Sequence, residues 1–190
     1  MAILPIVTYD DGILHKKAVP VEKLTPEISK LIDDMFETMY NADGVGLAAP
    51  QIGKLHRIFV VDADGMTEEL DEPKQGPTAF INPEIVEKGG DEVEMDEGCL
   101  SIPGVNAVVV RPERITVKYL DEDFEEQQLE AEGWLSRVIQ HEYDHLEGIL
   151  FLDHLSGFKQ KLLYSKLKEI DEGKKETDYP LVPKKPAATT

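Results

Sequence analysis

Residues 141–145 read His-Glu-Tyr-Asp-His, inside a segment whose apolar residues recur at helical spacing. On an α-helix, His141 and His145 lie one turn apart on the same face, so their imidazoles can bind one metal ion. Glu142 falls near the middle of the apolar stripe, where a carboxylate is costly without a partner. A metal and its water would be such a partner, and Glu142 could take a proton from that water. The alternative is a buried Glu paired with an Arg beside two structural histidines.

The composition is that of one globular domain. The chain has 190 residues, 41% of them hydrophobic, which is enough for a core that folds alone. No apolar run approaches the ~20 residues that cross a membrane, and residues 1–11 show no secretory signal. The net charge of −18 disfavours non-specific binding of nucleic acid by the whole surface. We expect a cytoplasmic protein that acts as a monomer.

The pattern along the chain predicts a single-domain α+β fold, with short antiparallel sheets around the metal-binding helix and a helix near each end. The first helix should begin after the N-cap Thr25 and end by residues 41–44, and the motif helix should follow Gly133 and stop at Gly148. The last helix should span residues 156–172, and residues 62–77 should form a polar loop. Strands are expected at residues 58–61, 80–87, 92–95, 105–110, 115–120 and about 125–131.

Three further expectations concern turns, the last helix and the end of the chain. Gly89-Gly90 is typical of a hairpin, and Pro112 predicts a turn between two strands. The catalytic domain should comprise residues 1–172, followed by a disordered tail at residues 173–190 that contains three prolines. The apolar side of the last helix should consist of Phe158, Leu162, Leu163, Leu167 and Ile170.

A catalytic metal site needs a third protein ligand and one open position. One protease pattern has a third histidine at the position of Phe151, so that pattern fails here. Glu169 and Glu172 lie on a helix that looks solvated, and His154 is more typical of a surface residue. Cys99, the one cysteine, stands among Gly, Ser and Pro in an exposed, shaped segment, and a thiolate suits such a metal.

Another segment, Gly44 to Gly53, is too rich in glycine and small residues for a regular element. It is either a tight connection or a loop whose backbone approaches a ligand, and it lacks the Gly-Lys-Ser/Thr of a phosphate-binding loop. Together with residues 97–104 and 140–145, this segment resembles the three signature motifs of the peptide deformylases, in order and at fitting separations. The resemblance covers roughly residues 3–170.

The resemblance implies an enzyme that removes the formyl group from the N-terminal methionine of nascent chains. It implies one divalent metal ion, ferrous iron first, with zinc, nickel or cobalt as alternatives. Cys99, His141 and His145 would be its ligands and Glu142 the general base. The Gln51 side-chain amide and the Leu100 backbone N–H would donate to the reaction oxyanion.

The resemblance also places substrate contacts and one structural ion pair. Backbone at Gly44, Val45 and Gly46 would contact the peptide, and the methionine pocket would be lined by Met95, Trp134, Arg137 and Val138. Trp134 and Arg137 depart from the expected aliphatic residues. Arg137 either faces solvent or shapes the pocket rim, and we favour the rim. Glu97 and Arg111 would pair behind the site.

Two rival functions and one partner remain to be tested. A metallo-endopeptidase would need a downstream ligand, and a non-catalytic structural metal site would need a fourth protein ligand. The lysines of the last helix are either a solvated face or a local contact with the ribosome, whose RNA is anionic.

Overall fold

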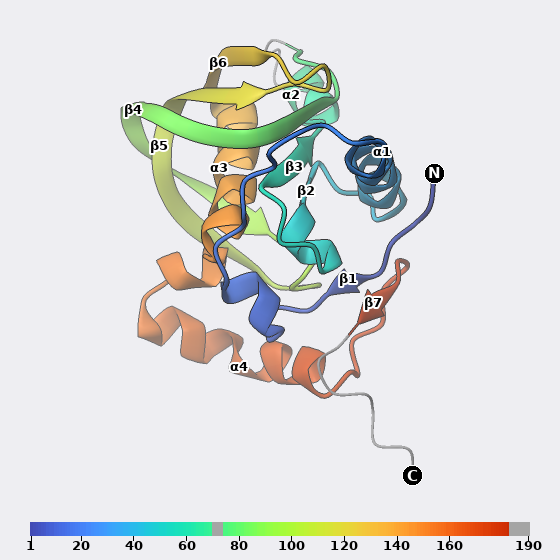
Figure 1. Cartoon of the computed structure of the whole chain (residues 1–190). Helices are drawn as coiled ribbons and strands as arrows, with labels where there is room; N and C mark the ends of the chain where they lie inside the picture. The colour runs from blue at the N-terminus through green and yellow to red at the C-terminus, as the bar shows by residue number, and fades with distance from the viewer. Residues whose placement is uncertain (70–73, 183–190) are drawn as a thin grey trace.

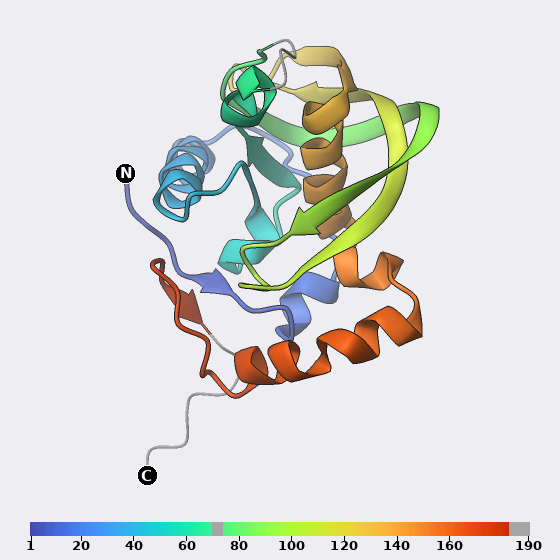
Figure 2. The same ribbon diagram turned by 180° about the vertical axis from the view of Figure 1, so that it is seen from behind.

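The computed structural model describes residues 1–69 and 74–182, and Figures 1 and 2 show it from opposite sides. In chain order the elements, with η marking short 3-10 helices, are β1 (Ile6–Val7), η1 (Gly12–His15), α1 (Pro26–Asn41), β2 (Gly46–Ala48), η2 (Ala49–Ile52), β3 (Ile58–Val61), α2 (Asp64–Glu69), β4 (Thr78–Gly98), β5 (Asn106–Leu120), β6 (Glu126–Glu132), α3 (Gly133–Glu147), η3 (Phe151–His154), α4 (Gly157–Asp171) and β7 (Leu181–Val182).

The main sheet is antiparallel, in the order β2-β3-β4-β5-β6, and it curves around α3 (Figure 1). The apolar side of α3, with Val138, Ile139 and Leu146, packs in one buried cluster with Phe59 of β3 and Phe80 of β4. The α+β prediction, with a central helix and an antiparallel sheet, is confirmed. This central packing holds the motif helix against the sheet over most of its length.

The predicted hairpin at Gly89-Gly90 is wrong. β4 runs unbroken through these glycines, with a register shift against β5 between Gly89 and Glu92 and a φ of 77° at Gly90. Pro112 likewise lies inside β5, opposite Glu92, so the predicted turn is also wrong. Residues that signal turns also form bulges, and a bulge bends a strand without ending it. The long curved ribbons of β4 and β5 in Figure 2 are the result.

The first helix is as predicted. Thr25 caps α1 by accepting a hydrogen bond from the Ile28 N–H at 3.3 Å, and Pro26 occupies the first turn. Its buried stripe packs on β2 and β3 in a second cluster that includes Ile32 and Met35. The packing of α1 therefore fixes the position at which the Gly44–Gly53 segment begins.

The predicted polar loop at residues 62–77 contains the short helix α2. The Asp62 carboxylate accepts from the Asp64 N–H at 3.2 Å, and Asp64 accepts from the N–H groups of Gln75 and Gly76, each at 3.0 Å. These bonds close the loop on itself, while residues 70–73 lie outside the described part of the chain. No helix among the described residues is long and apolar enough to cross a membrane.

The apolar side predicted for the last helix is only partly buried. Leu163, Leu167 and Ile170 pack against the third core cluster, but Phe158 and Leu162 are 72% and 66% exposed. The reason is that α4 lies across one end of the molecule, where only a narrow side can touch the body (Figure 1).

Residues 174–182 differ from the expected disordered tail. The segment returns from α4 to the N-terminal strand, where β7 pairs in parallel with β1. The Ile6 N–H donates to the Pro180 carbonyl at 2.9 Å. The pairing of β7 with β1 was not predicted, because a parallel pairing with a strand at the other end of the chain leaves no pattern in the local sequence. Residues 183–190 of the predicted tail lie outside the described residues.

Candidate metal centre and active site

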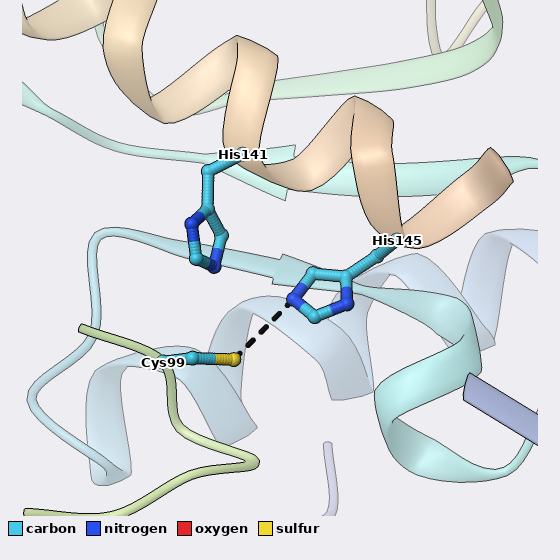
Figure 3. Close-up of side chains that lie close together, drawn as sticks. All are labelled: Cys99, His141 and His145. Atoms are coloured by element: carbon cyan, nitrogen blue, oxygen red, sulfur yellow. Dashed lines mark hydrogen bonds between the residues drawn. The ribbon is translucent and has the colours of Figure 1, made fainter. Parts of the chain in front are cut away.

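The three predicted ligands lie together. The Cys99 sulfur and one ring nitrogen from each of His141 and His145 are all within 4.8 Å of one another. In Figure 3 both imidazoles leave the same side of α3 and point toward Cys99, whose Sγ is 3.4 Å from His145 Nε2. Among the described residues this is the one cluster of three or more His, Cys, Asp or Glu side chains able to hold a metal. Two imidazoles, a thiolate and no fourth such ligand suit an open catalytic site.

Glycines and turns place these side chains. The N–H of Gly148 bonds to the Asp144 and His145 carbonyls with a φ of 76°, a left-handed conformation that suits glycine and ends α3. Cys99 comes directly after the last residue of β4, and a turn follows it in which the Ile102 N–H donates to the Cys99 carbonyl at 2.9 Å. The sulfur is thus held at the edge of the sheet, facing the helix.

Behind the metal centre, the Glu97 carboxylate accepts hydrogen bonds from three side chains. Its carboxylate is buried and accepts from Arg111 at 2.6 and 3.0 Å, from Arg137 at 2.8 Å and from His141 Nδ1 at 2.9 Å. Burial alone would raise the pKa of Glu97, but the hydrogen bonds from His141 and Arg111 hold it well below its ordinary value. Because Glu97 accepts the Nδ1 proton of His141, Nε2 of that ring is left to bind a metal. The predicted Glu97–Arg111 pair is present.

Arg137 is not solvent-facing. The residue borders the cavity but is only 3% exposed, and its guanidinium donates to Glu97 and to the carbonyls of Val93 and Val109 at 2.6 and 3.0 Å. The physical reason is helical spacing: Arg137 lies one turn before His141, so it shares the face that meets Glu97. The positive charge of Arg137 is therefore paired with Glu97 behind the site.

Glu142 is buried and close to the Gly44–Gly53 segment. A Cβ on Gly46 would lie 2.5 Å from Glu142 Oε1, so only glycine leaves room for the carboxylate. Glu142 Oε2 has no hydrogen-bond partner among the described residues. Burial raises the pKa of Glu142 to about 7, with the charge of His141 acting in the opposite direction. A carboxylate of that pKa can take up and return a proton near neutral pH.

Gln51 presents its amide nitrogen to the cluster. Its Oε1 accepts the Ala48 N–H at 2.8 Å, which leaves Nε2 to face Ser101 Oγ at 3.3 Å and Cys99 Sγ at 3.5 Å. Leu100, the other predicted oxyanion donor, follows Cys99 directly. A Cβ on Gly44 would lie 2.8 Å from Leu100 Cδ1, so this glycine allows the leucine to approach.

A cavity of about 760 Å³ opens over this arrangement. The predicted site residues that line it are Gly44, Val45, Gly46, Gln51, Cys99, Leu100, Trp134, Arg137, Val138, His141 and Glu142. Met95, predicted for the methionine pocket, is not among the lining residues. Its neighbour on β4, Asp96, does border the opening.

Two features of the site escaped the sequence reasoning. Asp144 accepts from Arg111 and from His154, each at 2.7 Å, so His154 pairs with this carboxylate and does not join the cluster. A charged residue inside the motif of a largely buried helix was a usable signal for that pairing. Residues 175–179 also line the cavity, and only the single aromatic Tyr179 in a proline-rich stretch hinted at packing there.

Comparison with known proteins agrees with this geometry. Residues 3–161 match the sequence model of a family described as polypeptide deformylase. A peptide deformylase of Salinibacter ruber is 54% identical over 187 residues, covering 96% of this chain and 95% of that protein. One of Cytophaga hutchinsonii is 50% identical over 179 residues, with 93% and 95% covered.

A solved structure shows the same fold. The crystal structure of peptide deformylase from Ehrlichia chaffeensis in complex with actinonin is 46% identical, with a TM-score of 0.83 and coverage of 89% of this chain and 98% of that one. The chain therefore belongs to the polypeptide deformylase family, metal-dependent hydrolases that remove N-terminal formyl groups.

Proposed function

We propose that this protein hydrolyses the formyl amide of N-terminal formyl-methionine on newly made polypeptides in the cytoplasm and releases formate. The observation that carries the proposal is the cluster of Cys99, His141 and His145 beside a buried carboxylate oxygen of Glu142 that has no hydrogen-bond partner in the described part of the chain. We also propose that the enzyme acts as a monomer. Sedimentation of the active enzyme tests that last point.

Cys99, His141 and His145 would hold the metal ion, which would supply an acidic water and polarise the formyl carbonyl. Glu142, buried beside His141, takes the proton of the attacking water and passes it to the departing amine. Gln51 Nε2 and the Leu100 N–H stabilise the negative charge that develops on the formyl oxygen. Each donor is worth about 3 kcal/mol by comparison with other oxyanion sites. Backbone at Gly46, next to Glu142, borders the path of the peptide.

The test compares Glu142→Gln with Glu132→Gln, an exposed glutamate just before α3 that lies outside the cavity lining. Formate release from formyl-Met-Ala-Ser should fall by at least about 100-fold in the first variant, with its metal content retained, and should not change in the second. Turnover by Glu142→Gln at the wild-type rate would remove Glu142 from the mechanism. Cleavage of an unformylated internal peptide would support the endopeptidase instead. Actinonin, bound in the related structure, should inhibit formate release.

We propose ferrous iron as the metal in the cell, with zinc, nickel or cobalt as functional or partial substitutes. The ligand set of one thiolate and two imidazoles suits all of these ions, so the choice must be measured. An open site with a thiolate ligand should make the iron enzyme sensitive to oxygen. Anaerobic purification, metal analysis and a formate assay should show activity lost in air with iron and kept with nickel. Air-stable activity of an iron-only sample would contradict this choice.

We propose the ribosome as a transient partner through the basic side of α4. Its lysines are exposed and its N-terminal half also exposes Phe158 and Leu162. The overall charge of −18 requires any contact with anionic RNA to be local. The variant reverses four charges together at Lys159, Lys161, Lys166 and Lys168. It should lose salt-sensitive co-sedimentation with ribosomes and keep its activity on the free tripeptide, while reversal of the exposed Lys23 and Lys54 should change neither.

A further inference from the structure

The segment of residues 174–182, called here the C-terminal segment, runs along the loop that carries Cys99. At its far end Pro180 and β7 are bound to β1, which Figures 1 and 2 show beside it. Nearer α4, a Cβ on Gly104 would lie 2.7 Å from Lys175 Nζ, so the lysine lies over that glycine. Between these two contacts, Tyr179 Oη donates to the Leu100 carbonyl at 2.8 Å.

The same segment forms one side of the active-site cavity. Its residues 175–179 line the opening together with His141 and Glu142. Thr177 Oγ1 donates to the Tyr179 carbonyl at 2.6 Å, which bonds the segment to itself just before the tyrosine. The cavity is therefore bounded by residues that precede α4 in the sequence and by residues that follow it, although the family match ends at residue 161.

Three successive carbonyls of the Cys99 loop each accept one hydrogen bond. The Cys99 carbonyl accepts from the Ile102 N–H at 2.9 Å, and the Ser101 carbonyl from the Tyr9 N–H at 3.0 Å. The Leu100 carbonyl accepts from the Tyr179 hydroxyl. Burial raises the pKa of Tyr179 to about 12, so this hydroxyl keeps its proton throughout the working range of an enzyme. Of the three donors, only Tyr179 is a side chain that a single substitution can remove without altering the backbone.

We propose that Tyr179 is a positioning residue for deformylation, which holds the Leu100 backbone so that its N–H faces the formyl oxygen, and that the C-terminal segment is a wall of the active site. The inference rests on the proposed function through the role of Leu100. The Leu100 carbonyl and N–H lie in adjacent peptide planes that meet at the Leu100 Cα, so a bond to the carbonyl restricts φ and ψ of Leu100 and with them the directions its N–H can take. Without this bond the N–H would sample directions that do not meet the developing charge.

The test removes only the hydroxyl. Tyr179→Phe keeps the ring, which packs against the core cluster under α1, and loses the bond to Leu100. The matched control is Tyr164→Phe on α4, because that ring is 67% exposed. The kcat for formyl-Met-Ala-Ser should fall about fivefold in Tyr179→Phe, the effect of one neutral hydrogen bond. KM and metal content should stay within error of the wild-type values, and the control should change neither constant.

A merely structural role would look different. A lower melting temperature with unchanged kcat would overturn the positioning role. The absorption bands of the cobalt-substituted enzyme report the thiolate ligand and should be the same in Tyr179→Phe; a spectral shift that accompanies the loss of kcat would also overturn it. An inactive wild-type enzyme would reject the proposed function itself, whereas an active wild type matched by Tyr179→Phe would reject only this inference.

The proposal that the C-terminal segment forms a wall of the active site is tested by truncation. Ending the chain after Gly173 removes the C-terminal segment, and ending it after Val182 keeps all the residues described here. The shorter chain should lose at least as much kcat as Tyr179→Phe and should have a higher KM, while the longer one should match the full chain. Unchanged constants in a folded, metal-loaded shorter chain would overturn the wall. Tyr179→Phe decides the positioning role even where the shorter chain fails to fold.

Discussion

Replacing Glu97 with glutamine keeps the shape of the side chain and removes the anion that joins two arginines to the metal centre. Each carboxylate oxygen accepts two hydrogen bonds: Oε1 from Arg111 and Arg137, Oε2 from Arg111 and His141. An amide offers one oxygen and one NH₂ group. In either orientation of the amide, its NH₂ group replaces one of the two carboxylate oxygens. The two hydrogen bonds to that oxygen are lost, and their two buried donors then face the NH₂ group, which is itself a donor.

The cost follows from which charges keep a partner. Arg111 retains Asp144 at 2.7 Å, whereas Arg137, 3% exposed, contacts no other carboxylate among the described residues. Breaking a buried pair from one side costs about 3–5 kcal/mol. For a chain of this length, that lowers the melting temperature by about 6–20 °C. Loss of the acceptor for His141 Nδ1 should also weaken metal binding about 10- to 100-fold.

Two measurements check these values in parallel. Urea unfolding of the metal-free proteins gives the stability difference without the ion, and competition with a chelator gives the nickel affinity. The control is Asp96→Asn, one residue earlier on β4, where an exposed carboxylate accepts from Asn106 at 3.1 Å. It should change stability by no more than about 0.5 kcal/mol. A Glu97→Gln protein within about 1 kcal/mol of wild type, with unchanged nickel affinity, would refute the argument that this carboxylate compensates the buried charges.

Two other predictions concern Glu142. Gly46→Ala places a methyl group 2.5 Å from Glu142 Oε1 and should lower kcat roughly 100-fold by displacing the carboxylate; formate release measures this, and retained metal content shows that the ligands have not moved. Burial raises the pKa of Glu142 from 4.5 to about 7, so the metal-free protein should lose about 3 kcal/mol of stability as the pH rises through that interval, because the unfolded chain releases the proton first. Metal-free Glu142→Gln should lack this loss and exceed the wild type in stability at pH 8 but not at pH 4.5, as urea unfolding at the two values will show; parallel curves for the two proteins would contradict the raised pKa.

The helices could be predicted because their signals are local. Thr25 and Pro26 define the start of α1, and Gly148 defines the end of α3, through bonds that span four residues or fewer. The long strands could not be predicted in the same way. Gly90 and Pro112 suggest turns when each is considered with its sequence neighbours alone. Only the pairing of β4 with β5 over their whole lengths keeps the chain extended through them.

The position of the metal ligands in space could not be predicted from local sequence either. Spacing on the helix fixed His141 and His145 as a pair, but Cys99 reached them by exclusion of other ligands and by resemblance. Its position depends on where β4 ends relative to α3, a distance set by the packing of the whole sheet. Arg137 borders the cavity, but its bond to Glu97 was not predicted, because nothing local shows that the helix face carrying His141 would meet Glu97.

The clearest anomaly in the sequence is also the clearest anomaly in the structure. An acidic residue in the middle of an apolar stripe was the first sign of a functional site, and Glu142 Oε2 is a buried oxygen with no hydrogen-bond partner among the described residues. Around it, Glu97, Arg111, Arg137 and Asp144 are all bonded to one another or to the chain. A fold that leaves a buried carboxylate oxygen without a hydrogen bond accepts lower stability at that point. Such a cost is expected where a carboxylate must remain free to accept a proton, so the oxygen that has no partner among the described residues supports the proposal that Glu142 is the reacting group and that its bonded neighbours position it.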